Sequence, residues 1–235
     1  MSSGAYALTP FTLQDYPGGC ACIIWVSGCN MRCSYCHNPQ IVLGAPQVPL
    51  HEVQRFLERR SGLLDAVVFS GGEATSWPEL PGLMRHAKQL GYATKLDTNG
   101  LRPDVLTRLL DAQLLDTIAL DYKAPFNKFR HITRTTAWQR FQTSLALLCR
   151  QPQFLTEIRT TVHTSLLDED DINQIISDLE QQNYTGTYAL QNYNNDRHTP
   201  TLAPLPPQIR PLDLTRINRP VDLNIVFRNF RPALH

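Results

Sequence analysis

Three cysteines, Cys29, Cys33 and Cys36, stand within eight residues of one another in a polar segment. Thiolates are soft ligands that suit iron–sulfur clusters, zinc and copper(I). A structural zinc ion takes four protein ligands, whereas three thiolates on a four-iron cluster leave one iron open to another molecule. Because His37 follows Cys36 directly, a Cys3His zinc site also fits the spacing. The spacing alone therefore predicts a metal centre and leaves the cluster and zinc as alternatives.

The other three cysteines stand in a different kind of sequence. Cys20 and Cys22 flank or begin an apolar run, and Cys149 ends an amphipathic stretch. Free cysteine most often behaves as a small buried apolar residue. We therefore predict that these three pack in the core and bind no metal.

Polar groups also follow the next three apolar runs of the chain. Gly71–Glu73 pairs two glycines with a carboxylate, so that backbone N–H groups can approach a ligand and the carboxylate can meet an ammonium group. Asp97 follows the next run, and Asp121 and Lys123 follow the one after it. Each group alone is typical of a turn or a helix cap. Because they recur at successive strand ends, we expect them to face one cavity.

Short β-branched runs alternate with amphipathic stretches along most of the chain, which predicts successive βα units. The expected strands span Cys22–Val26, Ala66–Phe69, Tyr92–Leu96, Thr117–Leu120, Thr156–Val162 and Thr187–Leu190, with one more at Leu223–Phe227. The expected helices span His51–Arg60, Pro78–Leu90, Pro103–Gln113, Ala137–Arg150 and Glu169–Gln182. A polar loop is expected from the first strand to about Pro49. Such units form a parallel sheet covered by helices, as an open sheet or a partial barrel.

The pattern fails after Asn192, where prolines cluster at Pro200, Pro204, Pro206, Pro207 and Pro211. We interpret this stretch as an ordered irregular excursion or a flap. The expected organisation is one domain, with a core at residues 1–191 and an irregular Pro-rich extension at residues 192–235 that packs on it.

Composition excludes several classes of protein. The net charge of +1 gives no sign of a basic face for nucleic acid or an anionic membrane. No apolar run is long enough to cross a bilayer, and residues 1–10 do not read as a secretory signal. We therefore expect a cytoplasmic protein without nucleic-acid or membrane partners, in which paired disulfides are disfavoured.

In combination, the motifs CxxxCxxC, GGE, DTNG and DYK at successive strand ends resemble the radical S-adenosylmethionine superfamily. Leu8–Gly18, which reads LTPFTLQDYPG, and Tyr35–Pro39, which reads YCHNP, are similar to anaerobic ribonucleoside-triphosphate reductase activating proteins, a group of glycyl radical enzyme activases. The resemblance extends from about Leu8 to Gln191. Ala74 departs from it, because the family usually has proline there. The cysteine-rich insert of several activases is also absent after Pro39, which points to a branch with a single cluster.

The resemblance implies a [4Fe–4S] cluster held by Cys29, Cys33 and Cys36, with the fourth iron binding the amino and carboxylate groups of S-adenosylmethionine. It places Tyr35 near the adenine. The fold that we expect is an α/β partial (β/α)6 barrel of the TIM type, open at one side.

The resemblance also implies contacts to S-adenosylmethionine from the strand ends. The methionine ammonium is expected at Gly71, Gly72 and Glu73. The other expected contacts are Asp97, Asp121 and Lys123, with Arg159 and Gln191 as carboxylate and ribose contacts. A monovalent cation beside the two aspartates and Thr98 is a further expectation.

The activity implied is reductive cleavage of S-adenosylmethionine to methionine and a 5′-deoxyadenosyl radical, which takes hydrogen from a glycine of a partner enzyme. The expected partners are an anaerobic ribonucleotide reductase and an electron donor such as flavodoxin or ferredoxin. Two alternatives remain. One is a radical S-adenosylmethionine enzyme with a small-molecule substrate, of the 7-deazaguanine synthase type. The other is a zinc-stabilised binding module without catalysis.

Overall fold

A curved sheet of eight strands, in the order β10-β9-β8-β7-β6-β5-β3-β2, organises the chain. The computed structural model describes residues 4–193, 201–208 and 210–230. The predicted strands are present as β3 (Ala21–Val26), β5 (Ala66–Gly71), β6 (Ala93–Thr98), β7 (Thr117–Asp121), β8 (Leu155–Val162) and β9 (Thr187–Asn192). The further strand, β10 (Asn224–Arg228), pairs in parallel with β9, so the sheet has seven parallel strands and not six.

The central strands are buried along their whole apolar length. In β5, residues Ala66–Phe69 are each fully buried, and Ile118, Ala119 and Leu120 are equally buried in β7. A parallel sheet that is covered on both faces requires such continuous apolar runs. The strand predictions rest on the same residues, because a run of β-branched and apolar residues without a polar face is typical of a buried strand.

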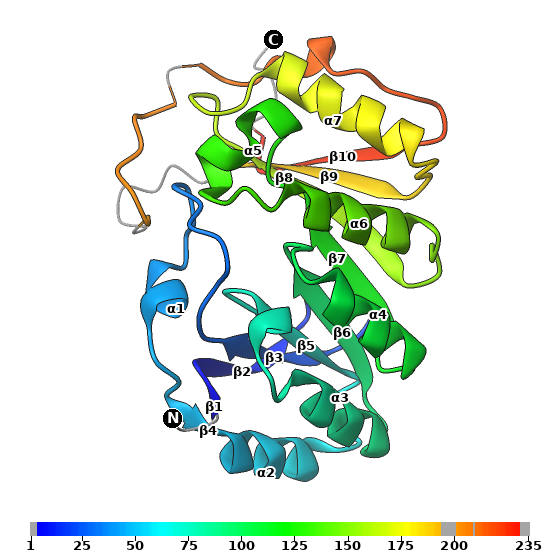
Figure 1. Cartoon of the computed structure of the whole chain (residues 1–235). Helices are drawn as coiled ribbons and strands as arrows, with labels where there is room; N and C mark the ends of the chain where they lie inside the picture. The colour runs from blue at the N-terminus through cyan, green and yellow to red at the C-terminus, as the bar shows by residue number, and fades with distance from the viewer. Residues whose placement is uncertain (1–3, 194–200, 209, 231–235) are drawn as a thin grey trace.

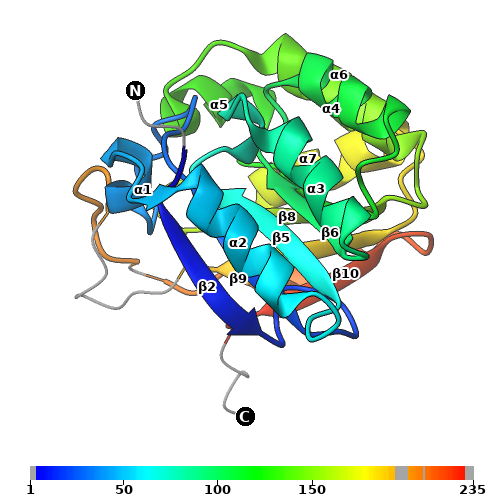
Figure 2. The ribbon, with the colours of Figure 1, turned by 90° about the horizontal axis from the view of Figure 1, so that it is seen from below.

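Five helices cover the outer side of the sheet, as Figures 1 and 2 show. They are α2 (Leu50–Arg60), α3 (Leu80–Gln89), α4 (Pro103–Asp111), α6 (Trp138–Cys149) and α7 (Glu169–Gln181), and each corresponds to a predicted helix. Helix α7 begins with a capping box in which the side chains of Asp168 and Asp171 each accept from the other residue's backbone N–H. No helix in the described ranges is long and apolar enough to span a membrane.

Several short elements were not predicted. Helix α1 (Pro39–Leu43) lies in the stretch expected to be a loop, and α5 (Phe126–Thr133) follows β7. Strand β2 (Ala7–Thr12) pairs antiparallel with β3, and β1 (Gly4–Ala5) pairs with β4 (Val48–Pro49). Helices α1 and α5 and the two-residue strands β1 and β4 are too short for a periodic pattern to be recognised. Pro10 also disfavours a strand prediction for β2, although proline is tolerated at a sheet edge.

The two ends of the strand order, β2 and β10, do not pair with each other, so the barrel is open. The expected α/β partial barrel is confirmed, and the further strand predicted at Leu223–Phe227 adds a seventh parallel strand to its six. In Figure 1, α1 and the segment 201–208 lie on the open side, opposite the helices of the outer layer.

The Pro-rich region contacts α7 in its described part. Arg210 donates from Nη1 and Nη2 to the two carboxylate oxygens of Glu169, at 2.6 and 2.7 Å, and the Asp213 backbone N–H donates to the same carboxylate at 2.7 Å. A short 3-10 turn follows at Leu214–Arg216, and Asn173 of α7 donates to the Arg216 carbonyl. Pro200, which belongs to the predicted proline cluster, and residues 231–235 lie outside the described residues.

The Glu169–Arg210 pair makes stability depend on acid pH. Hydrogen bonds from Arg210, together with the Asp213 N–H, outweigh burial and hold the pKa of Glu169 at about 2, below its ordinary value of 4.5. This stabilisation is therefore present above pH 4.5 and is lost as the pH falls through about 2. We expect Glu169→Gln to lower the free energy of unfolding by about 2 kcal/mol at neutral pH. Urea titrations should show that the difference between variant and wild type becomes smaller as the pH falls from 4.5 to about 2. Glu180→Gln, on an exposed part of α7, is the control, and a pH-independent difference would contradict the prediction.

Candidate functional site

One cavity of about 280 Å³ collects nearly all of the predicted site residues. It lies at the carboxyl ends of the parallel strands, where chemistry gathers in folds of this type. The predicted residues in its lining are Cys29, Cys33, Cys36, Tyr35, Gly71, Gly72, Asp97, Asp121, Lys123, Arg159 and Gln191. Glu73 and Thr98, which was expected beside the monovalent cation, do not line it.

The cysteine loop between β3 and α1 is held from both sides. The backbone N–H of Gly28 donates to the carbonyl of Ile41 in α1, and the N–H of Arg32 donates to the carbonyl of Thr133 at the end of α5, both at 2.9 Å. The Arg32 guanidinium donates to the Cys29 carbonyl at 2.6 Å. These contacts fix the loop between α1 and α5.

Donors surround the first thiol of the loop. The Met31 backbone N–H lies 3.4 Å from Cys29 Sγ, and Asn99 Nδ2 lies 3.7 Å from it. Hydrogen bonds of this kind stabilise a thiolate that ligates a metal. Burial raises the pKa of Cys29 to about 12 and that of Cys33 to about 11, so metal binding must displace a proton from each thiol.

The donor set fits an iron–sulfur cluster. Three thiols from one loop face a cavity large enough for more than a single ion, and N–H donors point at one of them. Within the described ranges no three His, Cys, Asp or Glu side chains lie close enough together to hold one metal ion. His37, the alternative fourth ligand, stacks its ring on Tyr193 with ring centres 4.4 Å apart.

Gly71 and Gly72 bring the end of β5 against the cysteine loop. A Cβ at Gly72 would lie 1.9 Å from the carbonyl oxygen of Gly28, and a Cβ at Gly71 would lie 2.4 Å from the backbone nitrogen of Val26. Gly71 also has φ +122°, which favours glycine. Both glycines are therefore required by chain packing beneath the cysteine loop. Their predicted contact with the methionine ammonium remains a prediction.

Glu73 lies behind the cavity wall and is only 1% exposed. Its carboxylate accepts from the backbone N–H and hydroxyl of Thr75, from the Thr98 hydroxyl at 2.8 Å and from the Asn99 N–H at 2.7 Å. Burial raises the pKa of Glu73 despite these bonds. The carboxylate thus joins the loops after β5 and β6, and in this arrangement it meets protein donors rather than the cavity.

Charged groups of both signs meet at the far side of the cavity. Asp121 accepts from Arg159 Nε at 2.9 Å and from Lys123 Nζ at 3.0 Å. Burial would raise the pKa of Asp121, but the two cations outweigh it and hold the pKa at about 2. Asp97 lies 3.5 Å from Lys95 and 3.7 Å from Arg159, so protein cations already compensate it.

The expected monovalent cation remains a prediction. Thr98, which was expected near it, donates its hydroxyl to Glu73.

Tyr35 and Gln191 come to the cavity from different elements, the cysteine loop and β9. Tyr35 lines the cavity and is 4% exposed, and its buried hydroxyl has no hydrogen-bond partner among the described residues. Gln191 comes from the end of β9. The contact of Tyr35 with the adenine and that of Gln191 with the ribose remain predictions, and the position of both residues in the cavity lining is compatible with them.

Sequence reasoning missed several residues of this site. Asn99 contacts Cys29 Sγ, Ser70 donates to Asp97 at 3.1 Å, and Leu202 from the Pro-rich region lines the cavity. Asn99 stood within the DTNG motif, so its place at a strand end was a usable signal. No local signal marked Leu202, because tertiary folding alone brings it to the cavity.

Loss of Asp121 should destabilise the fold and weaken ligand binding. Asp121→Ala leaves Lys123 without its carboxylate and Arg159 with only the longer contacts to Asp97 and Glu157. We expect a loss of about 2 kcal/mol in urea unfolding, because removing one partner of a partly buried pair strands the other charges. Asp111→Ala, at an exposed carboxylate ending α4, is the control. Equal stability of the two variants would contradict the prediction.

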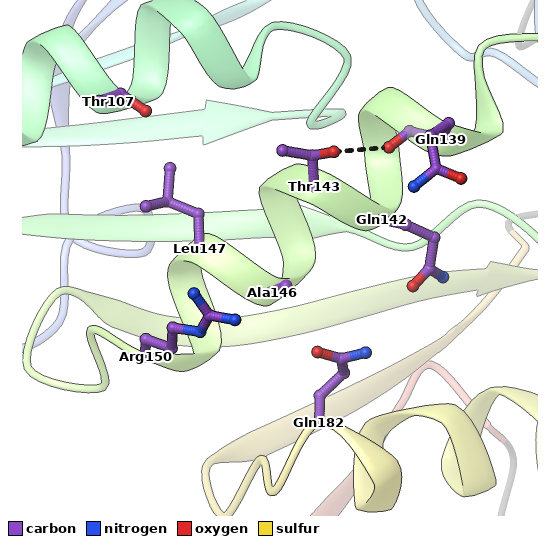
Figure 3. A pocket seen from close by; sticks show the side chains of 8 residues that line it. All are labelled: Thr107, Gln139, Gln142, Thr143, Ala146, Leu147, Arg150 and Gln182. Carbon is purple, nitrogen blue, oxygen red and sulfur yellow. Dashed lines mark hydrogen bonds between the residues drawn. The ribbon is translucent and has the colours of Figure 1, made fainter.

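A second hollow lies on the outer face of α6, between α4 and the end of α7 (Figure 3). Its lining comprises Thr107, Gln139, Gln142, Thr143, Ala146, Leu147, Arg150 and Gln182. These described side chains include no thiol and no carboxylate, so the hollow lacks the groups on which the metal prediction depends.

Comparisons with known proteins identify the family of the chain. The model of the Radical SAM superfamily matches residues 23–178, and the chain belongs to that family of enzymes. Within it, the chain is 31% identical over 185 residues to a Methanocaldococcus jannaschii protein provisionally named a glycyl-radical enzyme activating enzyme, covering 76% of this chain and 75% of the relative.

Two further similarities cover less of the other chain. The protein is 33% identical over 102 residues to the pyruvate formate-lyase-activating enzyme of Clostridium pasteurianum, covering 40% of this chain and 42% of that enzyme. The crystal structure of SuiB from Streptococcus suis matches with a TM-score of 0.62 at 13% identity, over 88% of this chain and 48% of that chain, which supports the fold alone.

Proposed function

We propose that this protein is a glycyl radical enzyme activase that binds a [4Fe–4S] cluster through Cys29, Cys33 and Cys36. The supporting observation is the single cavity that these thiols share with the strand-end groups, in a chain similar to activating enzymes over three quarters of its length. When bound, the cluster supplies the electron that cleaves S-adenosylmethionine to methionine and a 5′-deoxyadenosyl radical. The protein's own task is to bind, orient and shield the reactants.

The residues of the cavity suit a ligand that carries charges of both signs. Lys123 and Arg159 can receive a carboxylate, and Asp97 and Asp121 can receive cationic groups of S-adenosylmethionine. Because these positive and negative side chains neutralise one another, the cavity has charged groups of both signs and little net charge. Tyr35 adds a hydroxyl without a partner in the described part of the chain, on the same wall as the cysteines.

We infer that the target is a glycine of an anaerobic ribonucleoside-triphosphate reductase. The support is the similarity of Leu8–Gly18 and Tyr35–Pro39 to the activating proteins of that enzyme. A barrel left open between β2 and β10 is compatible with entry of a peptide loop.

An anaerobic assay tests the proposal in two stages. The protein is reconstituted with iron and sulfide, given S-adenosylmethionine and dithionite, and assayed for 5′-deoxyadenosine. Absence of product with an intact cluster would refute a radical activity, and bound zinc in a colourless protein would favour the binding module. Addition of the reductase should then produce a glycyl radical by electron paramagnetic resonance. Cleavage without that radical would favour a small-molecule substrate.

A further inference from the structure

Helix α5 presents an exposed basic face that the cavity does not use. Phe126 and Arg130 lie one turn apart on the helix, and Arg134 ends it one turn later. All three are exposed, Phe126 to 70%. The opposite face of α5 buries Phe129 and Ile132 in the core. The exposed face is therefore available for contact with another molecule.

The arginines of this face lie in a part of the chain that is poor in carboxylates. Residues 122–156 contain no Asp or Glu but six Lys and Arg residues, and residues 16–51, which include the cysteine loop, contain no Asp or Glu either. Lys123 pairs with Asp121 and Lys128 with Asp171, whereas no ion pair among the described residues includes Arg130 or Arg134. Two arginines four residues apart on a helix repel each other.

The exposed face of α5 lies beside the cysteine loop. The Arg32 N–H donates to the Thr133 carbonyl at the end of α5, and the exposed Arg32 side chain donates to the carbonyls of Cys29 and Met31. Figure 1 shows the loop after β3 passing next to α5. We define the α5 basic patch as Arg32, Phe126, Arg130 and Arg134. None of these four residues lines the cavity.

We propose that the α5 basic patch is the docking surface for an acidic electron-carrier protein. This inference rests on the proposed function, because reductive cleavage needs an electron from outside. The carrier loses one electron, and S-adenosylmethionine gains it as its bond from sulfur to C5′ breaks to give methionine and a 5′-deoxyadenosyl radical. The target glycine must enter the cavity, so the carrier needs a different approach, and the outer side of the cysteine loop provides one. Complementary charge would steer it there, and Phe126 provides an apolar contact.

The test uses a charge reversal with a matched control. Arg130→Glu/Arg134→Glu reverses two charges of the patch, and Arg55→Glu/Arg59→Glu makes the same change on α2, where both arginines are also exposed and four residues apart. Helix α2 lies at the other end of the molecule from α5 (Figure 1). The reconstituted proteins are compared with enzymatically reduced bacterial flavodoxin and with dithionite as electron sources. Flavodoxin binding is measured separately by calorimetry.

We expect the patch variant to bind flavodoxin about tenfold more weakly and to need about tenfold more of it for half-maximal 5′-deoxyadenosine formation. Its rate with dithionite should stay within about twofold of the wild type, and the α2 variant should match the wild type throughout. If the two variants bind flavodoxin equally well, the α5 basic patch is not the docking surface. Cleavage with dithionite would still support the proposed function in that case. A patch variant impaired only in glycyl radical formation on the reductase would also overturn it, by assigning the patch to that enzyme. If the wild-type protein does not cleave S-adenosylmethionine with dithionite, both the proposed function and this inference are refuted.

Discussion

Replacement of Cys33 by alanine is expected to abolish stable binding of the cluster and to lower 5′-deoxyadenosine formation by at least about a hundredfold. Cys33 is 7% exposed, and its Sγ lies 4.0 Å from Met31 Sδ within the cysteine loop. Alanine removes one of the three thiolates without adding bulk, and no other described cysteine lines the cavity to replace it. Iron and sulfide content, visible absorption of the reconstituted protein and the cleavage assay measure the effect.

Cys149→Ala is the matched control for this prediction. Cys149 ends α6 and packs against the core from a partly buried position, and it does not line the cavity. We expect this variant to keep the cluster and its activity, with a small loss of stability from the missing sulfur. Loss of the cluster in Cys149→Ala with the fold intact would contradict the assignment of ligands. Retention of a full cluster in Cys33→Ala would do so more directly.

Gly72→Ala is expected to produce the second large effect, because it displaces the cysteine loop from below. The added Cβ would lie 1.9 Å from the Gly28 carbonyl oxygen and 3.2 Å from the Cys29 backbone nitrogen. Backbone atoms cannot turn aside as a flexible side chain can, so the loop must move. It would lose the hydrogen bonds from Gly72 N–H to Val26 and from Glu73 N–H to Gly28. We expect a loss of about 3 kcal/mol in urea unfolding, together with a reduced cluster content.

Gly82→Ala tests whether the loss of stability is specific to Gly72 or follows any replacement of glycine by alanine. Gly82 lies within α3, and a Cβ there would meet no atom within 4 Å. Gly82 lies in the first turn of α3, and alanine there should not destabilise the protein, because it restricts the unfolded chain. A Gly72→Ala protein as stable as the wild type, with normal cluster content, would show that the close approach of β5 to the cysteine loop is not required.

Local sequence predicted most of the fold because the signals act over short distances. The buried run Ala66–Phe69 and the helix at Glu169–Gln182 could be read from residue type and periodicity alone. The helices α1 and α5 could not, since they are only five and eight residues long. Strand β10 was foreseen, but its parallel pairing with β9 depends on a chain path through the Pro-rich region that no local pattern describes.

Residue types and spacing predicted which residues can carry the chemistry. Three thiols at Cys29, Cys33 and Cys36 and charged groups at the next strand ends follow from residue types, and parallel strands place their carboxyl ends together. The contacts that each of these groups makes depend on the tertiary structure. It turned Glu73 away from the cavity toward Thr98 and Asn99, and it pressed Gly72 against Gly28. The physical reason is the distance along the chain over which each property is set. Residue type and periodicity are local properties of the sequence. Burial, close packing and the partners of a charged group depend on segments that are far apart in the chain.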